Sequence, residues 1–123
     1  MTTPSTTIFS RGDIVLLPFQ FTDKPVAKNR PAAIVSSMPY HLARQEVIVA
    51  AITSRVRDPL LFGDHLILGW RTAGLPKPSV VTAILRTVKQ GMITRRVGTL
   101  PEDDLAHVDG RLAVALALPA AAR

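Results

Sequence analysis

The first hundred residues consist of short apolar segments separated by polar stretches that contain glycine or proline. Six of these segments have the length of β-strands: residues 14–19, 32–37, 47–53, 65–68, 79–88 and 95–100. The sequence VIVAAIT at residues 47–53 is long enough for a strand that is buried on both faces. Residues 22–30 and 55–63 are polar and predict exposed loops, and residues 39–45 suit a single helical turn.

The hydrophobic pattern changes near the end of the chain. Leu105, Val108, Leu112 and Leu116 recur at three- and four-residue steps, which places them in one stripe of an amphipathic helix. Pro101 suits an early helical position, and the three acidic residues after it suit the positive end of the helix dipole. Short strands followed by one helix predict a mainly β fold, either a small barrel or a half-open sandwich.

The chain has 123 residues, of which 47% are hydrophobic, so it suits one domain around one core. We predict a flexible N-terminal arm at residues 1–9, which are rich in threonine, and a single domain at residues 10–123. The N-terminus lacks the basic flank and apolar run of a secretion signal, and no apolar stretch has the roughly 20 residues of a membrane span. A cytoplasmic protein is therefore expected.

The chain carries 15 basic and 9 acidic residues, a formal charge of +6. This surplus favours a polyanionic partner, and nucleic acid is considered before a membrane surface. Because the chain has no cysteine, disulfides, iron–sulfur clusters and cysteine zinc sites are excluded. His41, His65 and His107 show no metal-ligand spacing, so neither a metal nor another cofactor is expected.

Several motifs occur in the order and spacing that resemble PemK/MazF-type toxins, the toxin halves of bacterial toxin–antitoxin pairs. They are GDIVLLPF at residues 12–19, RPA at residues 30–32, VAAITSR at residues 49–55, GLPKPSVV at residues 74–81 and RVGTL at residues 96–100. The resemblance extends over about residues 10–118. Each motif is weak alone, but their common order is specific.

This resemblance implies a fold, an activity and partners. The fold is a small SH3-like β-barrel of the CcdB/PemK type with a C-terminal α-helix, and the family forms homodimers. The implied activity is that of a sequence-selective endoribonuclease, which cuts single-stranded RNA without a metal ion and so inhibits translation. The implied partners are single-stranded RNA and a cognate acidic antitoxin of the MazE/PemI kind, with no membrane partner.

The resemblance assigns catalysis to Arg30, which precedes Pro31 in its motif, and to Thr53, at the end of the third strand. Ser54 and Arg55 follow in the motif and are expected to line the same site as RNA-binding residues. In such cleavage the RNA's own 2′-hydroxyl is the nucleophile. A guanidinium suits the reaction because its planar fork gives two donors to phosphate oxygens and keeps its charge. A threonine hydroxyl can donate to the same phosphate or orient the 2′-hydroxyl.

Three further residues are assigned to RNA binding. Lys28 flanks Arg30, while Ser79 and Arg86 belong to the predicted strand at residues 79–88, which often contacts RNA in this family. Outside the motif, a solvated loop cation would be the ordinary interpretation of Lys28 or Arg30.

Other residues also have structural interpretations. Thr53 suits the end of a strand through its β-propensity alone, and Ser79 suits a turn hydroxyl that bonds to the backbone. Trp70 either stacks on an RNA base or antitoxin peptide, or caps the barrel core. His41 and His65 are candidates for proton transfer and, equally, for structural hydrogen bonds.

Two other functions fit the same fold. One is a non-enzymatic poison like the plasmid toxins that trap DNA gyrase, although the chain end LPAAAR lacks the aromatic residue that carries the gyrase contact in those relatives. The other is an RNA-binding barrel without nuclease activity, which would bind RNA in a salt-sensitive manner and yield no product.

Overall fold

The computed structural model describes residues 7–19 and 28–119, and it confirms a mainly β fold with a C-terminal helix. The elements in chain order are β1 (Asp13–Phe19), β2 (Lys28–Ile34), α1 (Met38–Arg44), β3 (Glu46–Thr53), β4 (His65–Leu66), β5 (Val80–Lys89), the 3₁₀ turn η1 (Gln90–Met92), β6 (Arg95–Thr99) and α2 (Glu102–Ala115). The predicted segments agree with these elements to within a few residues, except at β2.

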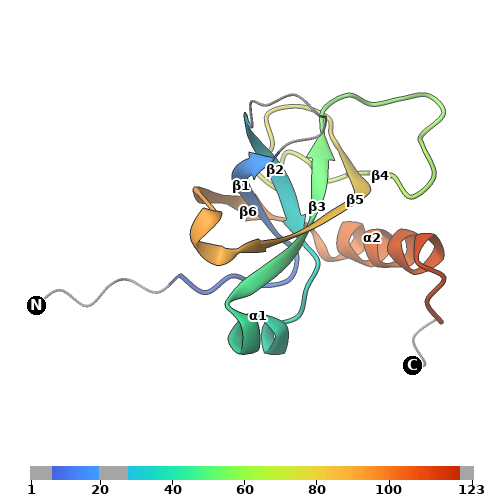
Figure 1. The fold of residues 1–123 in the computed structure, drawn as a ribbon. Helices are drawn as coiled ribbons and strands as arrows, with labels where there is room; N and C mark the ends of the chain where they lie inside the picture. The colour runs from blue at the N-terminus through green and yellow to red at the C-terminus, as the bar shows by residue number, and fades with distance from the viewer. Residues whose placement is uncertain (1–6, 20–27, 120–123) are drawn as a thin grey trace, which may run out of the picture.

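All six strands belong to one antiparallel sheet with the order β4-β5-β3-β2-β1-β6, which curls into a half-barrel (Figure 1). The register shifts between Ile14 and Val15 in β1 and between Ala50 and Ile52 in β3. Such irregularities increase the local twist and bend of a strand, and so they help the sheet to curl. As a result, β1 and β5 approach each other although two strands lie between them in the sheet.

The sheet buries apolar side chains on both faces. One face carries Ile14, Ile52 and Val81 and is packed against Val108 of α2. The other face is concave, and its side chains pack mainly against one another: Phe9, Val15, Leu17, Phe19, Ala32, Ile34, Val47, Val49 and Ala51. This second cluster is called the concave core below.

Two segments differ from the sequence prediction. Lys28, Asn29 and Arg30 belong to β2, whereas the sequence predicted a loop over residues 22–30; residues 22–27 of that loop lie outside the described residues. Their polar composition favours a loop, but they form a strand because they pair with the last three residues of β1. At its other end β2 stops at Ile34, and the Ser37 side chain caps α1.

Most of the predicted N-terminal arm, residues 1–9, also lies outside the described residues. Its last residue, Phe9, is only 8% exposed and belongs to the concave core. The backbone oxygen of Ile8 accepts a hydrogen bond from Arg96 of β6. The chain is therefore packed against the sheet from Phe9 onward.

The start of α2 is fastened to the segment that follows β4 through the carboxylate of Asp104. This carboxylate accepts hydrogen bonds from Nε2 of His65 (2.7 Å) and from the backbone N–H groups of Leu68 (2.9 Å) and Gly69 (3.0 Å). Burial by itself raises the pKa of Asp104, but these three hydrogen bonds and the nearby charge of His65 together outweigh burial and hold the pKa below its usual value. The ionised carboxylate thus stabilises the folded state.

We predict that Asp104→Asn lowers the free energy of unfolding at pH 7 by roughly 1–3 kcal/mol, because charged hydrogen bonds become neutral ones. The folded-state pKa of Asp104 lies below the unfolded value, so the stabilisation is complete above the unfolded pKa and is lost as the pH falls through the folded pKa. Urea unfolding should therefore show the difference between parent and variant shrinking on acidification. Exposed Asp103→Asn is the control, and a difference that does not change with pH would contradict this role.

Candidate functional site

Arg30 and Thr53 lie just beyond the paired part of β2 and β3. Ala32 of β2 pairs with Ala51 of β3 in an antiparallel register. Continuing that register by two residues places Arg30 opposite Thr53, at the end of the sheet where β3 finishes. Because directly opposed residues point to the same face of a sheet, both side chains lie on the face of the concave core.

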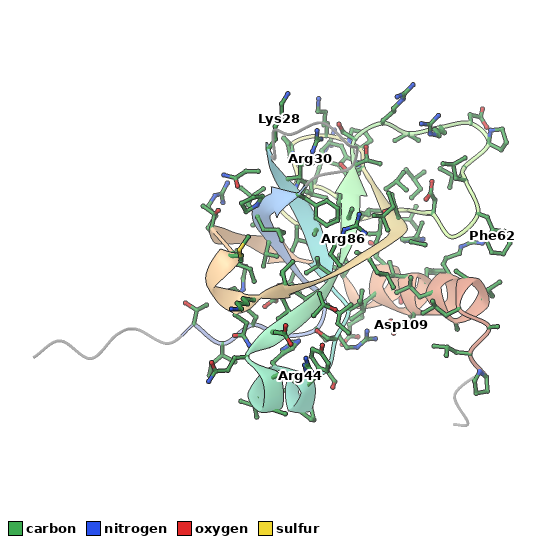
Figure 2. The ribbon with its side chains drawn as sticks, in the orientation of Figure 1. Lys28, Arg30, Arg44, Phe62, Arg86 and Asp109 are labelled. Carbon is green, nitrogen blue, oxygen red and sulfur yellow. The ribbon has the colours of Figure 1, made fainter. Side chains whose placement is uncertain are left out.

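Two more cations lie on this face. Lys28 is opposite Phe19 in the β1–β2 pairing, and Arg86 is opposite Val49 in the β3–β5 pairing. Phe19 and Val49 both belong to the concave core, so Lys28 and Arg86 share the face of Arg30. Figure 2 shows Lys28 and Arg30 near the start of β2, with Arg86 on β5.

We call the group formed by Lys28, Arg30, Thr53 and Arg86 the basic mouth. Three other arginines form ion pairs: Arg11 with Asp109, Arg44 with Glu46, and Arg96 with Asp13. In the basic mouth, cations from β2 and β5 share one face of the sheet with a hydroxyl group from β3.

The hydroxyl of Thr53 is fixed by the chain that follows it. The backbone N–H of Arg55 donates to Oγ1 of Thr53 at 3.1 Å, so this oxygen is held while its own hydrogen can still be donated. Ser54 and Arg55 are exposed and lie at the exit of β3. They therefore adjoin the basic mouth.

Ser79 does not have the same position. It is only 3% exposed, and its hydroxyl donates to the backbone oxygen of Lys77 at 2.9 Å. This agrees with the alternative of a turn hydroxyl bonded to the backbone. We therefore leave Ser79 out of the proposed interface.

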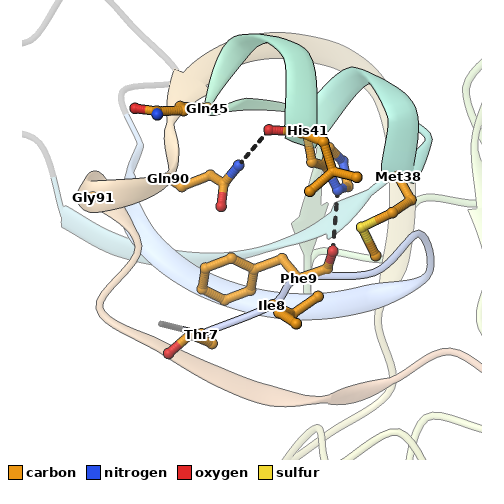
Figure 3. Close-up of a pocket in the computed structure, with 9 residues that line it drawn as sticks. Thr7, Ile8, Phe9, Met38, His41, Gln45, Gln90 and Gly91 are labelled. Carbon is orange, nitrogen blue, oxygen red and sulfur yellow. Dashed lines mark hydrogen bonds between the residues drawn. The ribbon is translucent and has the colours of Figure 1, made fainter. Parts of the chain in front are cut away.

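His41 is a structural residue in this fold. It is 4% exposed, and Nδ1 donates to the backbone oxygen of Phe9 at 3.1 Å (Figure 3). Nε2 lies 2.6 Å from Oγ of Ser36, which also accepts from the backbone N–H of Ile48. The ring thus joins the N-terminal segment to α1 and β3, beside a cavity of about 370 Å³ at the opposite end of β3 from Thr53.

His65 and Trp70, for which the sequence allowed two interpretations each, also have structural contacts. His65 binds Asp104 and stacks on His107, with ring centroids 5.2 Å apart. Trp70 packs against the core beneath α2, and the guanidinium of Arg71 lies 4.9 Å from the centre of its ring. Of the two interpretations of Trp70, the structure supports the one in which it caps the core.

No helix within residues 7–19 and 28–119 is long and apolar enough to cross a membrane. In the same part of the chain, no group of three or more histidine, aspartate or glutamate side chains is arranged to hold a metal ion.

A family model described as PemK-like, MazF-like toxin of type II toxin–antitoxin systems matches residues 10–116. The chain therefore belongs to this toxin family, as the sequence motifs predicted. Its similar relatives include the proteins named endoribonuclease MazF2 from Mycobacterium bovis and endoribonuclease MazF6 from Mycobacterium tuberculosis. Each is 33% identical over 85 residues, which cover 68% of this chain and 74% of the relative.

Solved structures of the family share the fold. An endoribonuclease in complex with its cognate antitoxin, from a mycobacterial species, aligns with a TM-score of 0.74 and 17% identity over 89% of this chain and 96% of that chain. A MazE–MazF structure from Deinococcus radiodurans aligns with a TM-score of 0.73 and 23% identity, over 92% of this chain and 100% of that chain. The structure of the Mycobacterium tuberculosis toxin MazF-mt6 aligns with a TM-score of 0.70 and 23% identity, over 87% of this chain and 98% of that chain.

We predict that His41→Leu lowers the free energy of unfolding by about 2–4 kcal/mol, because the oxygen of Phe9 and the hydroxyl of Ser36 both lose a buried partner. Urea unfolding followed by circular dichroism measures the change. The matched control is His107→Leu. His107 is exposed, donates to the backbone of its own helix and stacks on His65, so the change there should stay within about 1 kcal/mol. Equal losses in the two variants would refute the structural role of His41.

Proposed function

We propose that this toxin is an endoribonuclease that cuts single-stranded RNA at short sequences, without a metal ion, and thereby inhibits translation. The observation that supports the proposal is the antiparallel pairing of Ala32 with Ala51, which would put Arg30 opposite Thr53 if continued by two residues. The names of the relatives support the reaction class. The charge of +6 and the cations of the basic mouth support a polyanionic substrate.

In the proposed reaction the RNA supplies its own nucleophile. The 2′-oxygen of a ribose attacks the adjacent phosphorus, a new P–O bond forms, and the bond to the 5′-oxygen of the next nucleotide breaks. The 2′-hydroxyl gives up its proton and the leaving 5′-oxygen gains one. The products are a 2′,3′-cyclic phosphate and a 5′-hydroxyl end.

The residues of the basic mouth suit the phosphate in this reaction. The guanidinium of Arg30 offers two parallel donors to the phosphoryl oxygens, on which negative charge increases in the transition state. The hydroxyl of Thr53 is held by the backbone of Arg55 and can donate to the same phosphate. Lys28, Arg55 and Arg86, with the hydroxyl of Ser54, bind neighbouring phosphates and riboses. Two strands hold Arg30 and Thr53, which gives the rigid placement that catalysis needs.

We also propose that the protein acts in the cytoplasm as a homodimer, and that a cognate acidic antitoxin silences it. An acidic, disordered antitoxin tail matches the charge of the basic mouth and would block RNA simply by lying on the same cations. The division into an arm at residues 1–9 and a toxin domain at residues 10–123 stays a prediction.

We expect the purified toxin to cut a mixed single-stranded RNA in the presence of EDTA, and to leave 2′,3′-cyclic phosphate ends. Arg30→Ala and Thr53→Ala should each lower the cleavage rate about a hundredfold to a thousandfold, because each removes a donor that acts mainly in the transition state. An RNA with 2′-deoxyribose at the cut site should stay intact. Arg95→Ala, which removes an exposed cation from β6, is the control.

Three outcomes would overturn this function. Cleavage that survives in both variants would remove Arg30 and Thr53 from the mechanism. Intact RNA together with stalled gyrase supercoiling would support the non-enzymatic poison. Salt-sensitive RNA binding without any product would support an inactive barrel, with a log–log slope of about −0.7 per neutralised phosphate.

We predict that the cognate antitoxin competes with RNA for the toxin. Increasing antitoxin should raise the apparent Kd for a fluorescent RNA in proportion to its concentration, and it should slow cleavage to the same degree. Arg30→Ala should weaken the binding of both RNA and antitoxin, since both partners use the same cation. An antitoxin that binds fully without changing RNA affinity would show that the two sites are separate.

A further inference from the structure

Arg86 is held in place by an aromatic ring from a distant strand. Its guanidinium carbon lies 5.5 Å from the centre of the Phe19 ring, within the range of a cation–π interaction. Phe19 is the last residue of β1 and is only 3% exposed, whereas Arg86 is exposed on β5. Nη1 of Arg86 also donates to the backbone oxygen of Leu85 at 2.8 Å.

This contact depends on small residues in the strands between. In the sheet, β2 and β3 separate β1 from β5, so Phe19 and Arg86 meet only across the concave face. On that face the β2–β3 pair next to the basic mouth is Ala32 opposite Ala51, and both are fully buried. Methyl groups leave room above these two strands, which a larger pair would fill.

The contact also fixes a side chain that is otherwise flexible. An exposed arginine loses much rotamer freedom when it binds a phosphate, and this loss weakens binding. Here the guanidinium carbon lies over the ring of Phe19, and the backbone oxygen of Leu85 accepts a hydrogen bond from one of the five N–H groups. The remaining N–H groups are held ready at the basic mouth before any ligand arrives.

We propose that Phe19 is a positioning residue for RNA binding: its buried ring holds the Arg86 guanidinium in the geometry that contacts a phosphate next to the cut site. This inference rests on the proposed function, since it takes single-stranded RNA as the ligand. Phe19 itself contacts no RNA, because its ring is buried. It acts through Arg86, on substrate affinity and not on the bond-breaking step.

The test is a double-mutant cycle of Phe19→Leu and Arg86→Ala. Leucine keeps most of the apolar bulk in the concave core and removes the aromatic face. The probe is a fluorescein-labelled, mixed-sequence 2′-O-methyl oligonucleotide, which the proposed reaction cannot cut. We expect Arg86→Ala to raise its Kd about tenfold and to lower the log–log salt slope by about 0.7. Phe19→Leu should raise the Kd about threefold to tenfold.

The chain offers a matched control in Phe9→Leu. Phe9 is also a buried phenylalanine of the concave core, and the guanidinium of Arg96 lies 5.5 Å from its ring centre. It lies beside α1, at the other end of the sheet from the basic mouth. We expect Phe9→Leu to lower thermal stability about as much as Phe19→Leu and to leave the oligonucleotide Kd unchanged.

The cycle separates positioning from a general loss of structure. If Phe19 acts through Arg86, the double variant binds no more weakly than Arg86→Ala alone, and Phe19→Leu changes KM while kcat stays near the parent value. Losses that multiply in the double variant, or an unchanged Kd in Phe19→Leu, would overturn the inference. Equal weakening by Phe9→Leu would also overturn it, as an effect of stability alone.

A direct measurement keeps this result apart from the proposed function. The Nε–Hε resonance of Arg86 should move when the ring of Phe19 is removed and should not move in Phe9→Leu. Loss of RNA cleavage in Arg30→Ala tests the proposed function on its own. A parent protein that cuts RNA but shows multiplying losses contradicts only the role of Phe19, whereas a parent without affinity for the oligonucleotide contradicts both.

Discussion

The antiparallel register of β1, β2 and β3 is the constraint on which the rest of the site depends. Arg30 is fixed between Leu17 of β1 and the exit of β3, and its face is set by the parity of that register. If β2 slipped by one residue, Arg30 would point to the opposite face from Thr53. The apolar residues Ala32 and Ile34 of β2 would leave the concave core at the same time. The burial of Ala32 and Ile34 therefore enforces the same register that the basic mouth needs.

The sheet separates structural and functional groups between its two ends. Near α1, buried polar groups are tied to one another: His41 binds the oxygen of Phe9 and lies against Ser36. At the exit of β3 the basic mouth is instead cationic, and the side chains of Lys28 and Arg86 are exposed. Buried polar groups with partners contribute stability, whereas a cluster of like charges costs stability until an anion binds. The same strands thus connect a well-anchored end with an end suited to a polyanion.

Much of this could be predicted from the sequence, and the exceptions have physical reasons. The continuous apolar sequence of β3 and the helical stripe of α2 are local patterns, so both elements were predicted to within a few residues. The strand at Lys28 was missed because its pairing with Phe19 is a tertiary contact that overrides a polar composition. The burial of Ser79 likewise depends on packing that no local pattern records.

The contact between Phe19 and Arg86 shows why fold and site cannot be treated separately in so small a domain. A cation at the end of a flexible side chain is a poor ligand for phosphate until its freedom is reduced. The curl of the sheet supplies that restriction by bringing the concave core within reach of the basic mouth, and small side chains at Ala32 and Ala51 allow it. The same curl that buries Phe19 therefore prepares Arg86, so the apolar packing of this toxin is itself part of how it would recognise an anion.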